Sequence, residues 1–346
     1  MPSSPLTFYP SPPHAENLTD SFGRQLTYLR ISVTDRCNLH CSYCRPASEN
    51  YQAEARSHIL TFDEITRIVR VAAGLGVRKV RITGGEPLVR RNLTTLIAKI
   101  AAISGIDDLA MTSNASLLAQ AAQPLADAGL HRINISLDTL NPARFRALTG
   151  GDLAPVLDGI AAAQQAGLSP IKLNTVLMRG VNVGGEESEV ARLIDFAQLH
   201  DLTIRFIELM PMKQGLDWKR HYVAIDEVLA RNDLQARVAV DAPLVTGNTA
   251  ARYLPHKQGT GKVGFIMPMS EHFCSGCNRL RLTADGHLRS CLPANTELNL
   301  RDMMRQGADD AGIRALLLRA AMTKPEIGIY SFTQGKDQRS MIQIGG

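Results

Sequence analysis

Apolar and polar residues alternate in six short segments along the first two thirds of the chain. A period of two is typical of β-strands, whose successive side chains point to opposite faces of a sheet. The predicted strands are Tyr28–Thr34, Lys79–Thr83, Asp108–Ser113, Arg132–Leu137, Ile171–Leu177 and Leu202–Glu208.

Apolar residues recur at helical spacing between these strands. One predicted helix opens with Thr61 and Glu64, which form a capping-box pattern. The apolar positions that define three such helices are Phe62, Ile65, Ile68, Val69, Ala72 and Leu75, then Leu93, Leu96, Ile97, Ile100 and Ile103, then Val190, Leu193, Ile194 and Ala197. Six successive β–α units predict a parallel sheet that is either doubly wound or curved into a barrel.

One face of the predicted strands is polar and partly cationic. Strands of a parallel sheet that are buried on both faces normally read as continuous apolar runs, and a closed barrel fills its interior with branched aliphatic side chains. The polar positions here are Arg30, Ser32, Thr34, Lys79, Arg81, Thr83, Thr112, Asn114, Arg132, Asn134, Ser136, Lys172 and Asn174. An antiparallel sheet with one solvated face is an alternative, but the intervening helices argue against it. We therefore expect an open, incomplete α/β barrel of six strands whose interior holds a polar, anionic ligand.

The regular alternation ends near Pro211, which suggests three parts. Residues 1–20 are rich in Pro and Ser and are expected to form a flexible arm. Residues 21–210 would form the partial barrel. Residues 211–346 would form a C-terminal extension that ends in Gly345-Gly346.

Composition excludes several classes of protein. Of the 346 residues, 45% are hydrophobic and 21% charged, which is ordinary for a globular protein and excludes disorder over the whole chain. No apolar stretch reaches the roughly 18 residues of a membrane span, and the N-terminal segment lacks the pattern of a secretory signal. We expect a cytoplasmic protein that binds neither membrane nor nucleic acid, because the net charge is only +5 and no basic block is present.

The six cysteines fall into two groups of three, Cys37/Cys41/Cys44 and Cys274/Cys277/Cys291. Two odd groups far apart in sequence do not suit local disulfide pairing. A structural zinc site normally takes four protein ligands, so a Cys3His site with His40 or His272 remains an alternative for each triad. Three thiolates can also hold three irons of a [4Fe–4S] cluster and leave the fourth iron open for a ligand.

The spacing of Cys37-x3-Cys41-x2-Cys44 resembles that of the radical S-adenosylmethionine (SAM) enzymes. The Gly84-Gly85-Glu86-Pro87 sequence after the second strand is similar to the loop of those enzymes that takes the methionine amino group. The resemblance implies a [4Fe–4S] cluster on this triad. The residues that it implies for SAM binding are Tyr43, Gly85, Ser136 and Met210.

The second triad narrows the resemblance to one family. Cys274-Ser-Gly-Cys277-Asn-Arg279-Leu-Arg281 and Cys291, together with the terminal Gly-Gly, resemble the molybdenum-cofactor biosynthesis protein A family, the GTP 3′,8-cyclases. The resemblance implies a second [4Fe–4S] cluster on this triad, whose open iron takes the guanine of GTP. The residues that it implies for GTP binding are Arg30, Arg81, Thr112, Lys172, Arg279 and Arg281.

The same resemblance implies a reaction and its partners. An external one-electron donor reduces the first cluster, SAM is cleaved, and the resulting 5′-deoxyadenosyl radical takes hydrogen from C3′ of GTP, which then closes onto C8 of guanine. A downstream cyclic pyranopterin monophosphate synthase would use the product, and a homodimer is expected. Two alternatives stay open: another radical SAM enzyme with an auxiliary cluster, and a zinc-binding nucleic-acid module.

Overall fold

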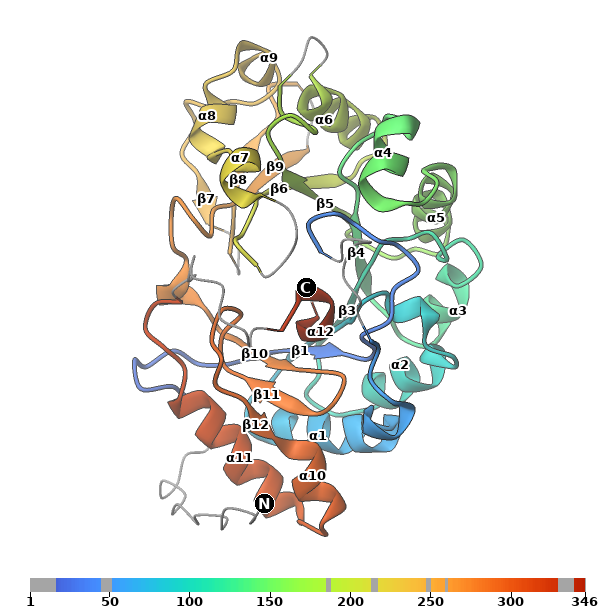
Figure 1. Ribbon diagram of the computed structural model, residues 1–346, viewed down its shortest axis with the longest axis vertical. Helices are drawn as coiled ribbons and strands as arrows, with labels where there is room; N and C mark the ends of the chain where they lie inside the picture. Colours follow the sequence, from blue (N-terminus) through green and yellow to red (C-terminus); the bar gives the residue numbers. More distant parts are fainter. Residues whose placement is uncertain are drawn as a thin grey trace.

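Twelve strands form one continuous sheet in the computed structural model, which describes residues 17–44, 52–184, 188–212, 217–246, 250–258, 261–328 and 339–345. The strand order is β12-β11-β10-β1-β2-β3-β4-β5-β6-β9-β8-β7. The two ends of this order are different strands, so the described sheet curves without closing on itself (Figure 1). The prediction of an open, incomplete barrel is confirmed.

The six predicted strands are all present and lie side by side in parallel. They are β1 (Tyr28–Ser32), β2 (Lys79–Thr83), β3 (Asp108–Ser113), β4 (Arg132–Ser136), β5 (Lys172–Leu177) and β6 (Thr203–Glu208). Two of them, β1 and β4, end two residues and one residue before their predicted limits, and β5 and β6 begin one residue later than predicted. The first strand, for example, ends at Ser32 because the chain then turns into the loop that carries the first cysteine triad.

The helices that alternate with these strands lie along the outer side of the curved sheet (Figure 1). They are α1 (Phe62–Gly74), α2 (Leu93–Ala101), α3 (Ala122–Asp127), α4 (Pro142–Thr149), α5 (Ala154–Gln165) and α6 (Glu189–Leu199), with the short 3₁₀ helices Arg56–His58 and Pro87–Val89. The predicted capping box at the start of α1 is present: the Thr61 hydroxyl accepts from the Glu64 backbone, and the Glu64 carboxylate accepts from the Thr61 backbone. The apolar strand residues that face these helices, such as Leu29, Ile31 and Ile82, are fully buried.

The C-terminal region extends the sheet at both edges, which the strand pattern did not predict. On one side, β9 (Lys262–Ile266) adds in parallel to β6, followed by β8 (Ala251–Pro255) and β7 (Val245–Thr246). On the other side, β10 (Arg279–Leu282) adds in parallel to β1, followed by β11 (His287–Arg289) and β12 (Leu298–Asn299). The described parallel run therefore includes β9 and β10 as well as the six predicted strands.

The remaining helices belong to the same C-terminal region. They are α7 (Trp218–His221), α8 (Ile225–Leu229), α9 (Asn232–Gln235), the 3₁₀ helix Cys274–Gly276, α10 (Leu300–Arg305), α11 (Asp310–Met322) and α12 (Met341–Ile344). The last of them, α12, lies on the inner side of the curved sheet (Figure 1). Within the described part of the chain, no helix has the length and apolar character needed to span a membrane.

The N-terminal segment is docked from residue 17 onward. Leu18 is buried, and its backbone N–H donates to the carbonyl of Leu75 at 2.9 Å. The rest of the predicted arm, residues 1–16, lies outside the described residues, and so does Gly346 at the other end.

Candidate active site

A cavity of about 330 Å³ lies on the inner side of the sheet and is lined by both cysteine triads. Its size is within the range of small-molecule sites, which is roughly 300–1,000 Å³. All the site residues that the sequence predicted line this cavity, with the exception of Lys172. The structure therefore brings together two motifs that are more than two hundred residues apart in the chain.

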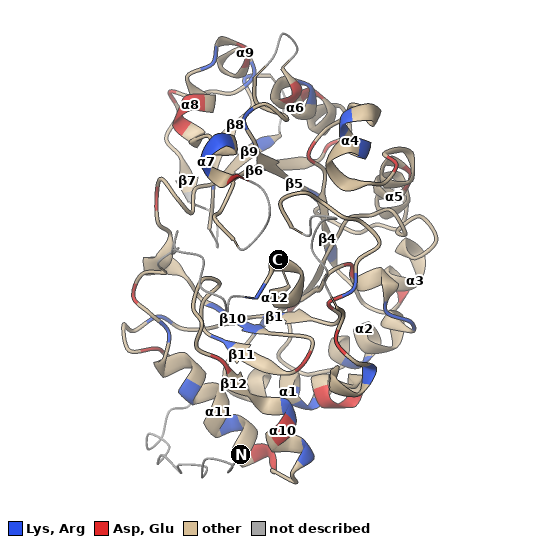
Figure 2. Ribbon diagram, viewed as in Figure 1, with Lys and Arg blue, Asp and Glu red and all other residues tan. Residues whose placement is uncertain are grey.

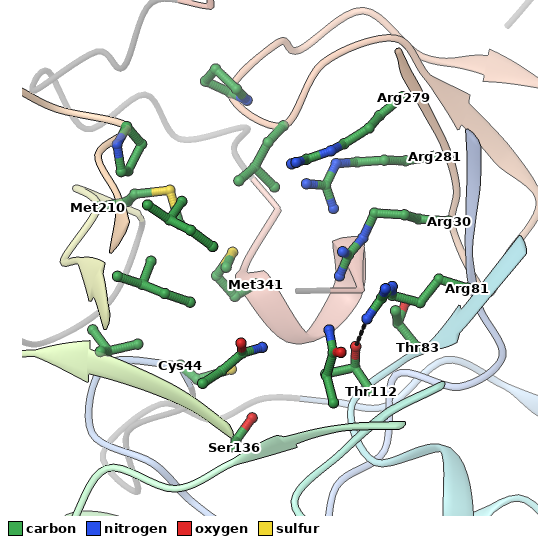
Figure 3. A pocket seen from close by; sticks show the side chains of 18 of the residues that line it. Arg30, Cys44, Arg81, Thr83, Thr112, Ser136, Met210, Arg279, Arg281 and Met341 are labelled. Atoms are coloured by element: carbon green, nitrogen blue, oxygen red, sulfur yellow. Dashed lines mark hydrogen bonds between the residues drawn. The ribbon is translucent and has the colours of Figure 1, made fainter. Parts of the chain in front are cut away.

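Four arginines from three neighbouring strands point into the cavity (Figure 3). Arg281 on β10, Arg30 on β1 and Arg81 on β2 are paired in register, so their side chains lie on the same face of the sheet. Arg279 precedes Arg281 by two residues and lines the same space. Figure 2 shows Lys and Arg on β1 and β10, beside α12.

This arginine cluster is largely buried. Arg81 is 4% exposed and Arg281 6%, and burial lowers the pKa of Arg30 well below its ordinary value. Buried like charges are costly unless an opposite charge compensates them, and Arg is suited to bidentate recognition of phosphate. The arrangement therefore suits a polyanionic ligand.

Tyr28 lies among these arginines and also lines the cavity. Its hydroxyl accepts a hydrogen bond from Arg81 Nε, and Arg81 also donates from Nη1 to the Thr112 hydroxyl at 3.4 Å. Burial alone would raise the pKa of Tyr28, but the charges of Arg81, Arg30 and Arg279 lower it to about 7. The sequence analysis did not propose Tyr28 for the site.

Lys172 lies on β5 outside the cavity lining. Its ammonium is 5.9 Å from the centre of the Tyr253 ring, and burial together with the charge of Arg205 lowers its pKa to about 8. Arg205 on β6 lines the cavity instead, and it donates to the Asn174 amide oxygen at 3.0 and 2.6 Å. Arg205 is a polar position in the alternation of polar and apolar residues along its strand, and this alternation is the sequence signal that could have identified it.

The first triad lies in the loop that follows β1. The Cys37 sulfur accepts from the Leu39 backbone N–H at 3.4 Å and from the Asn114 amide at 3.8 Å. Burial, the neighbouring thiols Cys44 and Cys37, and the carboxylate of Asp138 raise the pKa of Cys41. Asp138 also accepts a hydrogen bond from the Tyr43 hydroxyl at 2.7 Å, which anchors the end of the triad loop to the end of β4.

The glycines of the Gly84-Gly85-Glu86-Pro87 loop permit close contact with the segment that leads into the first triad. A Cβ on Gly85 would lie 2.3 Å from the Arg36 carbonyl oxygen, and one on Gly84 would lie 2.6 Å from that of Thr34. The Gly85 N–H donates to Thr34 at 2.7 Å. Only glycine allows this approach, so the loop positions the triad as well as lining the cavity.

Glu86 fixes the same loop to the end of β3. Its buried carboxylate accepts from the Asn114 backbone N–H at 2.7 Å and from the Ser113 hydroxyl at 2.8 Å. Burial raises the pKa of Glu86 to about 7 in spite of these bonds. Its role was not predicted, although it lies within the motif.

The second triad lies at the base of β10 and β11 among cations. Arg24 donates from Nη1 to the Cys274 carbonyl at 2.7 Å. Burial raises the pKa of Cys277, but the charges of Lys324 and Arg279 bring it below its ordinary value. Burial raises the pKa of Cys291, although Lys324 opposes that change.

Each triad supplies the three thiolates that a [4Fe–4S] cluster with one open iron takes from a protein. All six cysteines are free thiols. A [4Fe–4S] cluster binds each thiolate through a different iron, and backbone N–H donors to its sulfurs are typical, as the Leu39 N–H is to Cys37.

The C-terminal helix enters this site. Met341 lines the cavity, and Ile342 and Ile344 are buried. The Gly345 carbonyl accepts from the Thr83 hydroxyl at 3.1 Å and from Arg281 Nη1 at 3.4 Å. The tail therefore contacts the arginine cluster.

Comparison with known proteins identifies the family of this chain. The Radical SAM superfamily model matches residues 31–196, and the Molybdenum Cofactor Synthesis C model matches residues 202–328. A protein of Pelotomaculum thermopropionicum named GTP 3′,8-cyclase is 45% identical over 332 residues, which is 95% of this chain and 100% of that protein. One of the same name from Listeria monocytogenes is 42% identical over 338 residues, 95% of this chain and 99% of that protein.

A solved structure also shares the fold. That of Streptococcus suis SuiB bound to S-adenosylmethionine superposes with a TM-score of 0.56 at 17% identity, and covers 83% of this chain and 67% of that one. At this identity the likeness concerns the fold alone. The identities above 40% over nearly the full length, with both matching domain models, show that the chain belongs to the GTP 3′,8-cyclase family of radical SAM proteins.

Proposed function

We propose that this protein converts GTP to (8S)-3′,8-cyclo-7,8-dihydroguanosine 5′-triphosphate, the first step of molybdenum cofactor biosynthesis. The observation that carries the proposal is one cavity that is lined by both cysteine triads and by a cluster of largely buried arginines. The proposed reaction uses this combination, because both clusters and the triphosphate would meet in one cavity.

Two [4Fe–4S] clusters and SAM are the cofactors. Cys37, Cys41 and Cys44 would hold the first cluster, and Cys274, Cys277 and Cys291 the second. When bound, the first cluster and SAM supply the radical that removes the C3′ hydrogen of GTP. The chain contributes geometry: it holds the reacting carbon atoms together and keeps water away, as cofactor enzymes generally do.

The SAM side of the cavity would consist of Tyr43, Gly85, Ser136 and Met210. Ser136 and Met210 lie at or just after the ends of strands β4 and β6 and face the cavity, opposite the arginines (Figure 3). Tyr43 has its hydroxyl bound to Asp138, so its ring is oriented for contact rather than for proton transfer. This side is the less cationic one, which suits the methionine and adenosine parts of SAM.

The GTP side would consist of Arg30, Arg81, Thr112, Arg279 and Arg281. Their guanidinium groups would offset the charge of the triphosphate, which supplies the anion that the buried cluster requires. Lys172 pairs in register with the lining residue Asn134, so it would add positive charge from just outside the lining. Arg205 joins this set.

Further expectations follow from the family. The domain limits at residues 20 and 210 are proposed as functional rather than structural boundaries, because β9 and β10, which follow residue 210, belong to the same open sheet as β1 to β6. We also propose an external one-electron donor, a downstream cyclic pyranopterin monophosphate synthase and a homodimeric state.

A cytoplasmic location suits six free thiols, since reducing compartments keep cysteines unpaired.

The proposal is tested by an anaerobic assay of the reconstituted protein with GTP, SAM and dithionite. It predicts a brown protein and the formation of 5′-deoxyadenosine together with a cyclised guanosine triphosphate. A colourless zinc protein, or 5′-deoxyadenosine formed equally without GTP and with no cyclised product, would contradict it.

A further inference from the structure

The segment that follows α11 lies beside the second cysteine triad. Lys324 begins this segment and is 3% exposed, although lysine is among the residues least often buried. Gly328 ends it and lines the cavity beside the triad. None of the sequence motifs described above includes either residue.

The Lys324 ammonium donates to two backbone carbonyls next to the triad. Nζ donates to the Ser290 carbonyl at 2.7 Å and to the Arg279 carbonyl at 3.0 Å. Its positive charge also acts on Cys277, since burial raises the pKa of that thiol but the ammonium lowers it. Ser290 and Arg279 flank the triad in sequence, being next to Cys291 and two residues after Cys277, so these contacts fix the ammonium beside the sulfurs.

Gly328 brings the other end of the segment to the remaining two sulfurs. Its backbone N–H donates to Cys274 Sγ at 3.4 Å. A Cβ at this position would lie 2.9 Å from Cys291 Sγ, so the backbone approaches that sulfur closely. The segment Lys324–Gly328 therefore borders the triad, with Gly328 against Cys274 and Cys291.

The first triad has different electrostatic surroundings. The charges that act most strongly on Cys41 are those of Cys44, Asp138 and Cys37, all of which are negative when ionised. Those that act most strongly on Cys277 are the cations Lys324 and Arg279. The potential of an iron–sulfur cluster depends on the charge around it and on hydrogen bonds to its sulfurs, because reduction adds negative charge.

We propose that Lys324 is a positioning residue that raises the reduction potential of the cluster on the second triad. The inference rests on the proposed function, which places a [4Fe–4S] cluster there. The buried ammonium stabilises the reduced form, which carries one more electron, and the external donor consequently reduces this cluster more readily than it would without the lysine. Lys324 also lines the cavity, and in this proposal it acts through the cluster.

The test isolates the second cluster in the full-length chain that carries Cys37→Ser, Cys41→Ser and Cys44→Ser. Dithionite titration is followed by the electron paramagnetic resonance signal of the reduced cluster. Lys324→Met replaces the ammonium with an apolar group of similar length, and Lys324→Arg keeps the charge. Lys257→Met, at an exposed lysine, is the matched control.

We expect Lys324→Met to keep its iron and to need a lower potential for half-reduction. The ratio of reduced to oxidised cluster at a fixed potential should fall at least tenfold, which corresponds to a shift of about 59 mV for one electron. Lys324→Arg should recover most of this shift, and Lys257→Met should show none.

An unchanged midpoint in an iron-loaded Lys324→Met protein would overturn the inference. If Lys324→Met lacks iron, the potential of Lys324→Gln is measured instead, because its amide can still donate to the two carbonyls. Absence of iron from both variants would also overturn the inference, since the lysine would then be structural. Absence of a cluster signal from the parent chain would instead contradict the second cluster of the proposed function.

Discussion

Gly345 is the position at which one added methyl group should separate the C-terminal tail from the active site. The residue has φ +81°, and a Cβ would lie 2.5 Å from Thr83 Oγ1 and 2.8 Å from Ser32 Cβ. Both neighbours belong to barrel strands, β2 and β1, and both are buried. We therefore expect Gly345→Ala to undock the tail.

The expected magnitude follows from two costs. A left-handed backbone costs a non-glycine residue about 1–2 kcal/mol, and overpacking a filled site costs about 1–3 kcal/mol. Docking of the tail is driven by burial of Ile342 and Ile344, each worth about 1.5–3 kcal/mol before the entropy of ordering is subtracted. Because the cost is comparable to the gross gain, the docked state should no longer dominate.

The assay compares the initial rate of GTP cyclisation with the protection of the tail. Gly345→Ala should lower the rate at least about tenfold, which corresponds to about 1.4 kcal/mol, and the amide of Gly345, which donates to Met341 at 3.0 Å, should exchange faster with deuterium. Iron content and the midpoint of thermal unfolding should stay close to those of the parent.

Gly167→Ala is the matched control. Gly167 also has a positive φ, +72°, but nothing lies within 4 Å of its added Cβ. This variant should lose about 1 kcal/mol of stability and keep its cyclisation rate. The reasoning is refuted if Gly345→Ala cyclises GTP at the parent rate with a protected tail, or if Gly167→Ala loses activity to the same extent.

Three further changes test other parts of the account. Cys277→Ser should lower the iron content from about eight to about four per chain and abolish cyclisation while SAM cleavage persists; loss of cleavage would contradict the assigned roles of the triads. Tyr43→Phe removes the hydrogen bond to Asp138 and should lower the free energy of unfolding by about 1 kcal/mol, as chemical denaturation would measure; an unchanged value would count against this anchor. Burial raises the pKa of Asp108, but hydrogen bonds from Arg132 and Lys79 lower it to about 2, so its stabilisation is present at neutral pH and is lost as the pH falls from about 4 through 2. Asp108→Asn should therefore be less stable than the parent at pH 7 by about 1 kcal/mol. This difference in stability should shrink on acidification, and a difference that grew instead would contradict the prediction.

The central part of the fold could be predicted because its signals are local. Strand alternation and helical spacing each extend over enough residues to identify an element, as in β5 and α1. The polar face of the strands predicted an interior that holds a ligand, since the interior of a closed barrel is filled with apolar side chains. The two motif-bearing loops were found because cysteine and glycine patterns are specific in sequence.

The edges of the barrel could not be predicted in this way. Strand β10 is only four residues long, Arg279–Leu282, and its alternation was interpreted as part of a motif rather than as a strand. Its partner β1 is about 250 residues earlier in the chain, so nothing local specifies the pairing. Lys324 follows a helix, where a single lysine is ordinary, and only the tertiary structure places it beside the second triad.

The most direct test of the proposed reaction is the fate of the hydrogen on C3′ of GTP. The reconstituted protein is reduced anaerobically in the presence of SAM and GTP that carries deuterium at C3′, and the 5′-deoxyadenosine is analysed by mass spectrometry. The account predicts that one deuterium passes to 5′-deoxyadenosine and that a cyclised triphosphate forms in step with it. Cyclised product accompanied by unlabelled 5′-deoxyadenosine would contradict it.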